Sequence, residues 1–183
     1  MMVQYCESYR HHSKKFLTST KKVIRMPNMN WAVLNSLQLG KYAEYFAKME
    51  FASYGLEVFS SEVDDRGIDF IVKDTKGRFS EIQVKSLRGS GYVFAQKSKF
   101  NISNPNLYMA LLIFKEGQLP EIFLIPSQAW EVPNEVFVDR NYDKPGQTSK
   151  PEYGINISMK NYDILKTFKF EVTIQDFLSS SVN

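Results

Sequence analysis

Two short runs of alternating apolar and polar residues, separated by one turn, constrain the fold more than any other feature of this sequence. The runs cover residues 67–73 and 79–86. A three-residue loop, Thr75-Lys76-Gly77, would place Gly77 at the left-handed position that such hairpin loops require. The sequence therefore predicts a β-hairpin, and this loop sets the register between its two strands.

The predicted register divides the hairpin into two faces. Asp69 is expected opposite Gln83, and Gly67 opposite Lys85, with opposed side chains starting about 5 Å apart. Because successive strand residues point to opposite faces, the other face is apolar. Its residues are Ile68, Phe70, Val72, Ile82 and Val84. We expect the apolar face to join the core and the polar face to carry chemistry.

The polar face has the residue types that bind a hard divalent cation. Oxygen ligands could come from the Asp69 carboxylate, the Gln83 side-chain carbonyl and the backbone carbonyl of Val84. Lys85 could orient or deprotonate an attacking water, or neutralise a pentavalent transition state. Glu81 lies on the same face, as an extra ligand or as an ordinary solvated acid. This pattern favours metal-dependent cleavage of a phosphodiester bond.

Residue spacing elsewhere predicts an α/β fold with a central mixed β-sheet flanked by helices. A helix is expected over 39–54, with Gly55 as its C-terminal stop. Further strands are expected at 56–60 and 91–95, close enough to the hairpin for an antiparallel meander. The run 107–114 is apolar on both faces and predicts a buried central strand, with 121–125 as its neighbour.

The rest of the chain is less regular. A cap at Pro126-Ser127 predicts a short turn through Trp130, and 131–151, rich in Pro, Asn, Asp and Gly, predicts a loop excursion. A strand is expected at 153–158, a short helix at 161–168, and a last strand or an extended tail at 170–174. We therefore expect a flexible basic arm over 1–27 and one domain over 28–183, with its core at 39–125 and a C-terminal elaboration at 152–183.

The hairpin motif resembles a known family. The pattern Gly67-Ile68-Asp69-Phe70-Ile71-Val72, a turn, then Ile82-Gln83-Val84-Lys85-Ser86 is similar to the core of the PD-(D/E)xK nuclease superfamily, which has the restriction-endonuclease-like fold. The resemblance covers residues 39 to about 125. It implies an α-β-β-β-α-β core, a Mg²⁺ or Mn²⁺ cofactor, and DNA as the expected nucleic-acid substrate.

Gln83 departs from the family pattern, because it replaces the usual second acid. This variant is similar to Mrr-type restriction endonucleases and to several uncharacterised bacterial domains, and Ile68 stands where a proline usually precedes the aspartate. Losing one negative charge should weaken metal binding. The alternative is a catalytically silent protein of this fold that binds DNA or a protein partner.

The preceding helix adds to the resemblance. Gly40-Lys41-Tyr42-Ala43-Glu44 resembles the leading helix of archaeal Holliday-junction resolvases, in which a helical glutamate joins the metal site. The resemblance thus implies that Glu44 is a further metal ligand and catalytic residue. Helical steps also put Glu44 beside Lys41 and Lys48, so a surface ion pair is the alternative.

Charge gives weak support for nucleic-acid binding, since the net value is only +3 over 183 residues. The basic arm could touch a phosphate backbone or be merely solvated. Arg66 could grip a phosphate or join a local ion cluster. Beyond the hairpin, Arg88, Lys97 and Lys99 alternate with aromatic residues and could track a nucleic-acid backbone or form a solvated edge.

The remaining features bound the setting of the protein. The longest apolar run is too short to span a membrane, so we expect no membrane partner. The lone Cys6 cannot form an intramolecular disulfide or a cysteine-based metal site, which favours a cytoplasmic location. No helix-turn-helix pattern is present, so a homodimer or a partner subunit could supply the targeting.

Overall fold

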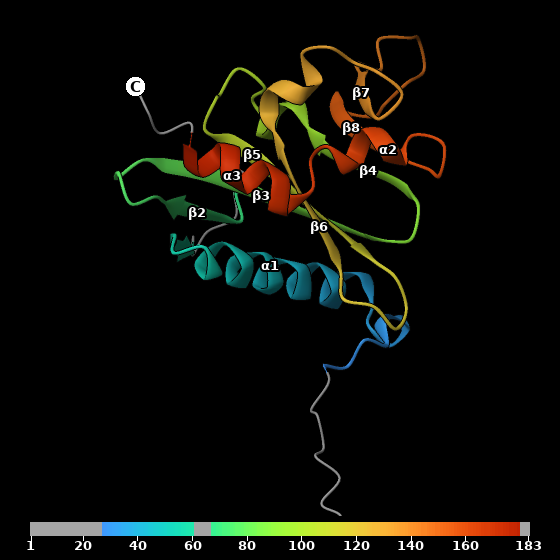
Figure 1. The fold of residues 1–183 in the computed structure, drawn as a ribbon. Coiled ribbons are helices and arrows are strands. Elements are labelled where there is room, and N and C mark those ends of the chain that lie inside the picture. Colours follow the sequence, from blue (N-terminus) through green and yellow to red (C-terminus); the bar gives the residue numbers. More distant parts are fainter. Residues whose placement is uncertain (1–26, 61–66, 180–183) are drawn as a thin grey trace, which may run out of the picture.

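The computed structural model describes residues 27–60 and 67–179. Most of the basic arm, with Cys6, and also Arg66 lie outside the described residues. The elements in chain order are η1 (Trp31–Val33), α1 (Ser36–Ser53), β1 (Glu57–Ser60), β2 (Phe70–Lys73), β3 (Phe79–Arg88), β4 (Gly91–Gln96), η2 (Lys97–Lys99), β5 (Leu107–Phe114), β6 (Glu121–Pro126), η3 (Ser127–Trp130), β7 (Phe137–Arg140), β8 (Glu152–Ile157), α2 (Tyr162–Lys166) and α3 (Phe170–Ser179) (Figure 1).

Two sheets organise these elements. The larger is five-stranded in the order β1-β2-β3-β5-β6, and the smaller is three-stranded in the order β4-β8-β7. The β3 and β5 strands are parallel, whereas the other neighbours in the larger sheet are antiparallel. Figure 1 shows α1 along one side of the larger sheet, with β7 and β8 beyond its other side. The expected mixed sheet flanked by helices is therefore confirmed.

Helix α1 forms as its sequence predicts. Asn35 and Gln38 make a capping box in which each side chain accepts a hydrogen bond from the backbone amide of the other, both at 2.9 Å. The buried positions recur every four residues and are Leu39, Ala43, Ala47 and Phe51. Gly55 follows with φ of +81°, so the left-handed residue expected at the end of the helix is present.

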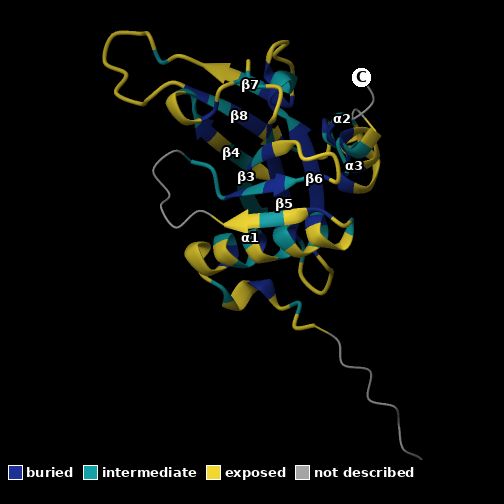
Figure 2. Ribbon diagram, turned by 90° about the vertical axis from the view of Figure 1, so that its left-hand side faces the viewer, coloured by how far each residue is buried: buried dark blue, intermediate teal, exposed yellow. Residues whose placement is uncertain are grey.

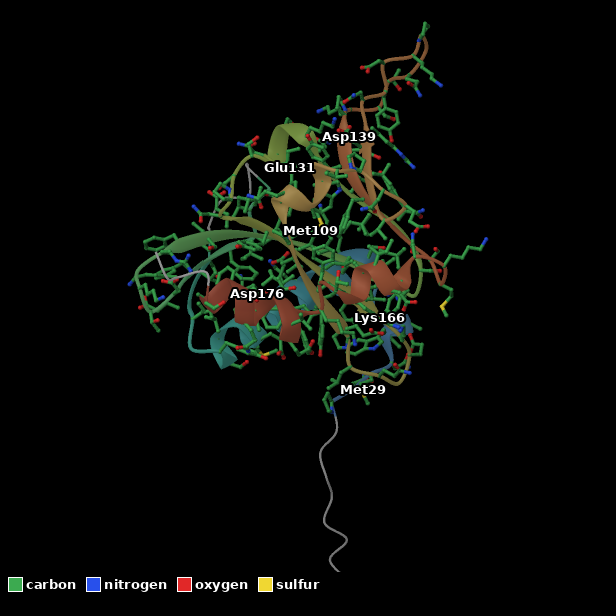
Figure 3. The ribbon with its side chains drawn as sticks, turned by 45° about the horizontal axis from the view of Figure 1, so that its top comes forward. Met29, Met109, Glu131, Asp139, Lys166 and Asp176 are labelled. Carbon is green, nitrogen blue, oxygen red and sulfur yellow. The ribbon has the colours of Figure 1, made fainter. Side chains whose placement is uncertain are left out.

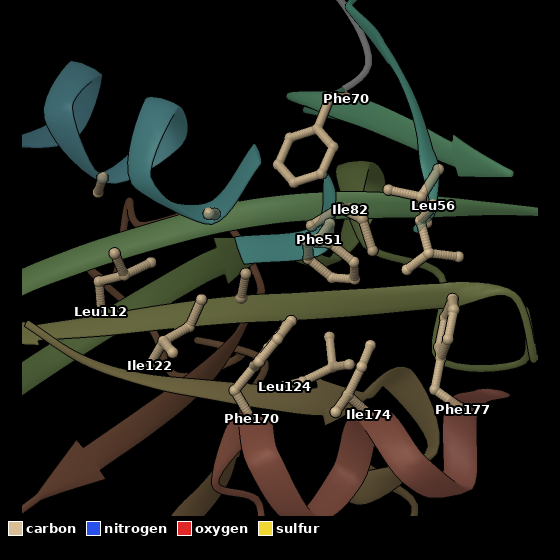
Figure 4. Close-up of a cluster of buried hydrophobic side chains, with 14 of the residues drawn as sticks. Phe51, Leu56, Phe70, Ile82, Leu112, Ile122, Leu124, Phe170, Ile174 and Phe177 are labelled. Atoms are coloured by element: carbon tan, nitrogen blue, oxygen red, sulfur yellow. The ribbon is translucent and has the colours of Figure 1, made fainter. Parts of the chain in front are cut away.

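One hydrophobic cluster lies between the larger sheet and the two helices α1 and α3. The Phe51 ring meets the rings of Phe70 and Phe170 edge-on, with centroids 5.6 and 5.0 Å apart, so α1 and α3 pack side by side on one face of the sheet (Figure 4). Figure 2 shows the complementary pattern on α1, whose outer surface is exposed.

A second hydrophobic cluster fills the space between the two sheets. Met109, labelled near the centre of Figure 3, packs there from β5, and Trp130 meets Phe100 and Phe137 edge-on at 5.2 and 5.0 Å. The β5 strand contributes to both clusters and is buried on both faces, as its continuous apolar run predicts.

The expected antiparallel meander ends at β3, since β4 pairs with β8 and not with β3. Gly89 in the turn after β3 and Gly91 at the start of β4 have φ of +64° and +148°, which lets the chain leave the plane of the larger sheet. The helix expected between the third strand and the central strand is absent from the described residues, and β4 with the 3₁₀ turn η2 occupies that stretch.

Two predictions for the C-terminal third are wrong. The stretch 131–151 contains strand β7, which pairs antiparallel with β8. Asn134 accepts hydrogen bonds from the amides of Val136 and Phe137 just before and at the start of this strand, and both residues are buried. The stretch 170–174 starts helix α3, whose buried face consists of Phe170, Ile174 and Phe177 at helical spacing. No helix in the described part of the chain has the length and apolarity to cross a membrane.

Candidate active site

The hairpin turn is built as its sequence predicts. Gly77 has φ of +84°, and the amides of Asp74 and Gly77 donate to the carbonyls of Arg78 and Asp74, both at 3.0 Å. The β2 and β3 strands then pair Ile71 with Glu81, which is the predicted register.

The buried Asp74 carboxylate holds this turn closed. It accepts hydrogen bonds from the backbone amides of Lys76 and Arg78 at 2.9 Å, and from Arg78 Nε at 2.8 Å. Burial raises the pKa of Asp74, but the hydrogen bonds from Arg78 and Lys76 outweigh it, so the net pKa lies below its usual range. The charged carboxylate thus fixes the register on which the site depends.

The pairing of β2 with β3 extends from the turn only as far as Phe70, so Asp69 lies just outside the paired region. The prediction of an unbroken hairpin over residues 67–86 is therefore wrong at this end. The last pair is Phe70 with Ile82, and the Asp69 amide donates to the Ile82 carbonyl at 2.9 Å. Ile68 then packs against the cluster between the sheets, although Phe70 packs on the α1 side. The chain has therefore turned out of the strand at Asp69.

Gly67 lies against Gln83 and Lys99, whereas the sequence predicted that it would lie opposite Lys85. A Cβ atom at Gly67 would lie 2.9 Å from Gln83 Nε2 and 3.1 Å from Lys99 Cβ. Its φ is +77°, in the region where only glycine is unstrained. Both the backbone turn and the close approach therefore require a glycine here.

The early end of the pairing leaves one edge of β3 open beside Asp69. The backbone amide of Val84 donates to Asp69 Oδ2 at 2.6 Å. Because the N–H and C=O groups of one strand residue point to the same edge, the Val84 carbonyl also points to this open edge. The hydrogen bond fixes the Asp69 carboxylate next to that carbonyl.

A cavity of about 260 Å³ collects these groups. Its lining residues are Gly67, Asp69, Gln83, Val84, Lys85, Phe94, Gln96 and Lys99. The structure therefore brings together Asp69, Gln83 and Lys85, together with Lys99 from η2. Sequence reasoning missed Phe94 and Gln96, because their approach depends on where β4 lies, although the period of two does place both on one face of that strand.

Gln83 has an unusual environment. Its side chain is 5% exposed, and within residues 27–60 and 67–179 its Oε1 has no hydrogen-bond partner. Leaving a buried acceptor unsatisfied costs about 1–3 kcal/mol, so native proteins keep such atoms rarely and often for a function. An oxygen of this kind beside a fixed carboxylate suits a divalent cation.

The donor set of the cavity has few charges. Among the described residues, no group of three or more His, Cys, Asp and Glu side chains could hold a metal ion. The oxygens available for a cation are the Asp69 carboxylate, Gln83 Oε1 and the Val84 carbonyl. This set fits a hard cation in ligand type, with one carboxylate.

Glu44 does not line the cavity and instead pairs with Lys41. Lys41 Nζ donates to Glu44 Oε2 at 2.5 Å, on a part of α1 that faces solvent. The hydrogen bond and the charge of Glu44 raise the pKa of Lys41, and Asp69 adds a smaller contribution of the same sign. The ion pair therefore lies within electrostatic reach of Asp69, and the metal-binding role of Glu44 stays a prediction.

The structure describes three of the residues predicted to contact nucleic acid, and two of them make hydrogen bonds within the protein. Arg88 Nη2 donates to the Trp31 carbonyl at 3.0 Å and also to that of Leu34. Lys97 donates to Asp139 and to Asn141 Oδ1, the latter at 2.6 Å. Lys99 is the third, and it is exposed at the cavity wall.

Comparisons with known proteins found distant likenesses in structure alone. No protein-family model and no curated protein sequence matched the chain. Hjc, a Holliday junction resolvase from the archaeal hyperthermophile Archaeoglobus fulgidus, matches with 9% identity over 68% of this chain and 88% of its own, at a TM-score of 0.41. The bacterial homing endonuclease I-Ssp6803I matches with 17% identity over 78% of this chain and 97% of its own, at a TM-score of 0.40.

Proposed function

We propose that this protein is a nuclease that hydrolyses phosphodiester bonds in DNA with Mg²⁺ or Mn²⁺ as its cofactor. The observation that carries the proposal is Gln83, whose buried Oε1 has no hydrogen-bond partner among the described residues and which lines the same cavity as Asp69. Asp69, Gln83 and the Val84 carbonyl would hold the cation. A divalent cation bound there would polarise the phosphate and offset the charge that develops on it.

Two lysines complete the proposed chemistry. Lys85 is adjacent to the Val84 carbonyl in sequence, and its ammonium can donate hydrogen bonds to a phosphate oxygen and orient the attacking water. Lys99, which lines the cavity from η2, can bind a neighbouring phosphate as a point charge. The cavity thus offers cationic groups for the DNA backbone and an oxygen set for the cofactor.

A plasmid-nicking assay with Mg²⁺ or Mn²⁺ tests the proposal. Asp69→Ala and Lys85→Ala are each expected to lower the rate by about 10²-fold or more, the usual effect of losing one transition-state contact. Asp143→Ala and Lys160→Ala make the same changes at exposed positions outside the cavity and serve as controls. Cleavage that persists unchanged in both cavity variants would show that the site is wrong.

The single carboxylate of the donor set favours a second candidate, a catalytically silent protein that binds DNA or a protein partner. Absence of cleavage together with DNA affinity that falls steeply with salt would select DNA binding. Absence of both would select a protein partner. For either candidate, a homodimer or a partner subunit would supply the choice of target, and size-exclusion chromatography with light scattering tests the homodimer.

A further inference from the structure

An aromatic surface on the outer face of the smaller sheet begins at the cavity. Phe94 lines the cavity and is 46% exposed. The Tyr92 ring is stacked beside it, with centroids 6.3 Å apart and planes inclined by 23°. The guanidinium of Arg140 lies 4.4 Å from the centroid of the Tyr92 ring. We call the row formed by Phe94, Tyr92 and Arg140 the stacking platform.

The platform is held rigidly by the strand beneath it. Tyr92 Oη donates to Glu152 Oε1 at 2.7 Å, and Glu152 is only 5% exposed. A Cβ atom at Gly154 would lie 2.0 Å from Tyr92 Oη, so β8 has a glycine where the ring crosses it. Burial and the hydrogen bond to Glu152 raise the pKa of Tyr92, so the phenol remains a donor. The ring is therefore fixed before any ligand binds.

Single exposed aromatic residues are common on protein surfaces and often have no binding role, and this chain has others outside the cavity. Phe59 and Phe79 are also exposed, and they contact each other on β1 and β3 with centroids 6.1 Å apart. Neither of them lines the cavity. Phe94 differs because it lines the same cavity as Lys85 and Lys99, whose ammonium groups suit a phosphate backbone.

Alternation of aromatic rings with cations is the arrangement that binds single-stranded nucleic acid, because bases stack on the rings while the cations follow the backbone. The internal bases of a duplex have both faces covered by their neighbours. Only an unpaired base or a terminal base can therefore offer a face to Phe94.

We propose that Phe94, at the cavity end of the stacking platform, stacks on an unpaired base of a DNA strand whose backbone enters the cavity. The preferred substrate then has a single-stranded segment next to the scissile phosphate, and a continuous duplex is a poor substrate. This inference rests on the proposed function for the position of the scissile phosphate. The platform itself needs no cofactor, so its binding can be measured without cleavage.

The test measures binding of the full chain in EDTA to a fluorescein-labelled single strand of roughly 12 nucleotides, a length within the usual range for one small domain. Its affinity for duplex is measured by competition with covalently closed circular duplex DNA, which has no terminal base. Phe94→Ala is expected to weaken single-strand affinity about 10-fold, in line with the loss of one stacked base, and to leave duplex affinity unchanged. Phe94→Trp should retain the affinity. Phe79→Ala removes a ring that is 54% exposed and lies outside the cavity, and it should have no effect.

A second readout reports stacking directly. A strand that contains 2-aminopurine should lose fluorescence on binding the wild-type protein and the Phe94→Trp variant, and should keep it with Phe94→Ala. Equal loss of affinity for single strand and duplex, or no loss for either, would overturn the proposal. Both of these affinity results are measured with the fluorescein-labelled strand and so do not depend on the 2-aminopurine signal.

The outcomes for the platform and for the nuclease activity can be separated. Metal-dependent cleavage that requires Asp69, with single-strand affinity unchanged by Phe94→Ala, overturns the platform and retains the nuclease. Single-strand binding that requires Phe94, with no cleavage under any metal, retains the platform and overturns the nuclease.

Discussion

Replacement of Gln83 with leucine separates the stability of the fold from the proposed binding of a cation. Gln83 is 5% exposed and its Oε1 has no partner in the described structure, so the metal-free protein carries an unsatisfied buried acceptor. Leucine has a similar size and no polar atom. Removing the acceptor should raise the free energy of unfolding by about 1–3 kcal/mol. For a chain of this length each kcal/mol corresponds to about 2–4 °C in Tm.

The difference in stability between the Gln83→Leu variant and the wild type should change sign when the cation is present. Wild-type protein gains RT ln(1 + [L]/Kd), which is about 2.7 kcal/mol at a cation concentration of 100 Kd. The Gln83→Leu variant lacks one of three oxygen ligands and should gain much less. The variant is therefore expected to melt above the wild type in EDTA, and at or below it in saturating Mg²⁺ or Mn²⁺.

Scanning calorimetry of both proteins in EDTA and in each metal measures this reversal. Gln128→Leu changes the same residue type in η3, outside the cavity, and should leave the response to metal unchanged. A Gln83→Leu variant that is less stable than the wild type in EDTA would contradict the interpretation of Oε1 as an unsatisfied atom. A variant with a wild-type rise in Tm on adding metal would refute Gln83 as a ligand.

Three further predictions concern the residues around the site. Gly67→Ala and Gly77→Ala both place a Cβ in left-handed backbone, which should lower the free energy of unfolding by about 1–2 kcal/mol each. Only the Cβ at position 67 would meet Gln83 Nε2. Calorimetric titration should therefore show weaker Mn²⁺ binding for Gly67→Ala alone. Asp74→Asn should lower stability by about 1–3 kcal/mol at pH 7. Because the pKa of Asp74 is lower in the folded state, its contribution to stability is present above about pH 4 and is lost as pH falls through the pKa of the folded state. Urea unfolding should therefore show the stability difference between wild type and Asp74→Asn closing in acid. A stability difference that is independent of pH would contradict this. Arg88→Ala should cost about 1–3 kcal/mol by freeing the carbonyls of Trp31 and Leu34, while leaving DNA affinity unchanged. Weaker DNA binding with normal stability would restore Arg88 as a DNA contact.

The features that sequence reasoning predicted correctly are those set by neighbouring residues. The register of the hairpin follows from the turn, where Gly77 supplies the positive φ and Asp74 accepts from the amides within it. Helix α1 follows from its capping box and its buried positions at four-residue steps. In both cases the signal and the structure it determines lie within one short stretch of the chain.

The features that sequence reasoning missed depend on residues distant in the chain. Alternation correctly identified a strand at β4, but its partner β8 begins at Glu152, 60 residues after Tyr92. Helix α3 is an exception, because its buried residues Phe170, Ile174 and Phe177 are close in the chain and have helical spacing, which the interpretation of 170–174 as an extended segment did not include. Without the position of β4, the place of Phe94 at the cavity could not be inferred.

The site itself depends on a break in the pattern that predicted it. In an unbroken hairpin Ile68 would pair with Val84, and the backbone groups of Val84 could then be used in strand pairing. Because the pairing ends at Phe70, the Val84 amide is available to Asp69 and its carbonyl to the cavity. The positive φ of Gly67 lets the chain approach Gln83 at the same point. A longer, regular β2 would give up both the fixed carboxylate and the open carbonyl, so the shortened strand and the unsatisfied Gln83 oxygen together indicate a region shaped for binding at some cost in stability.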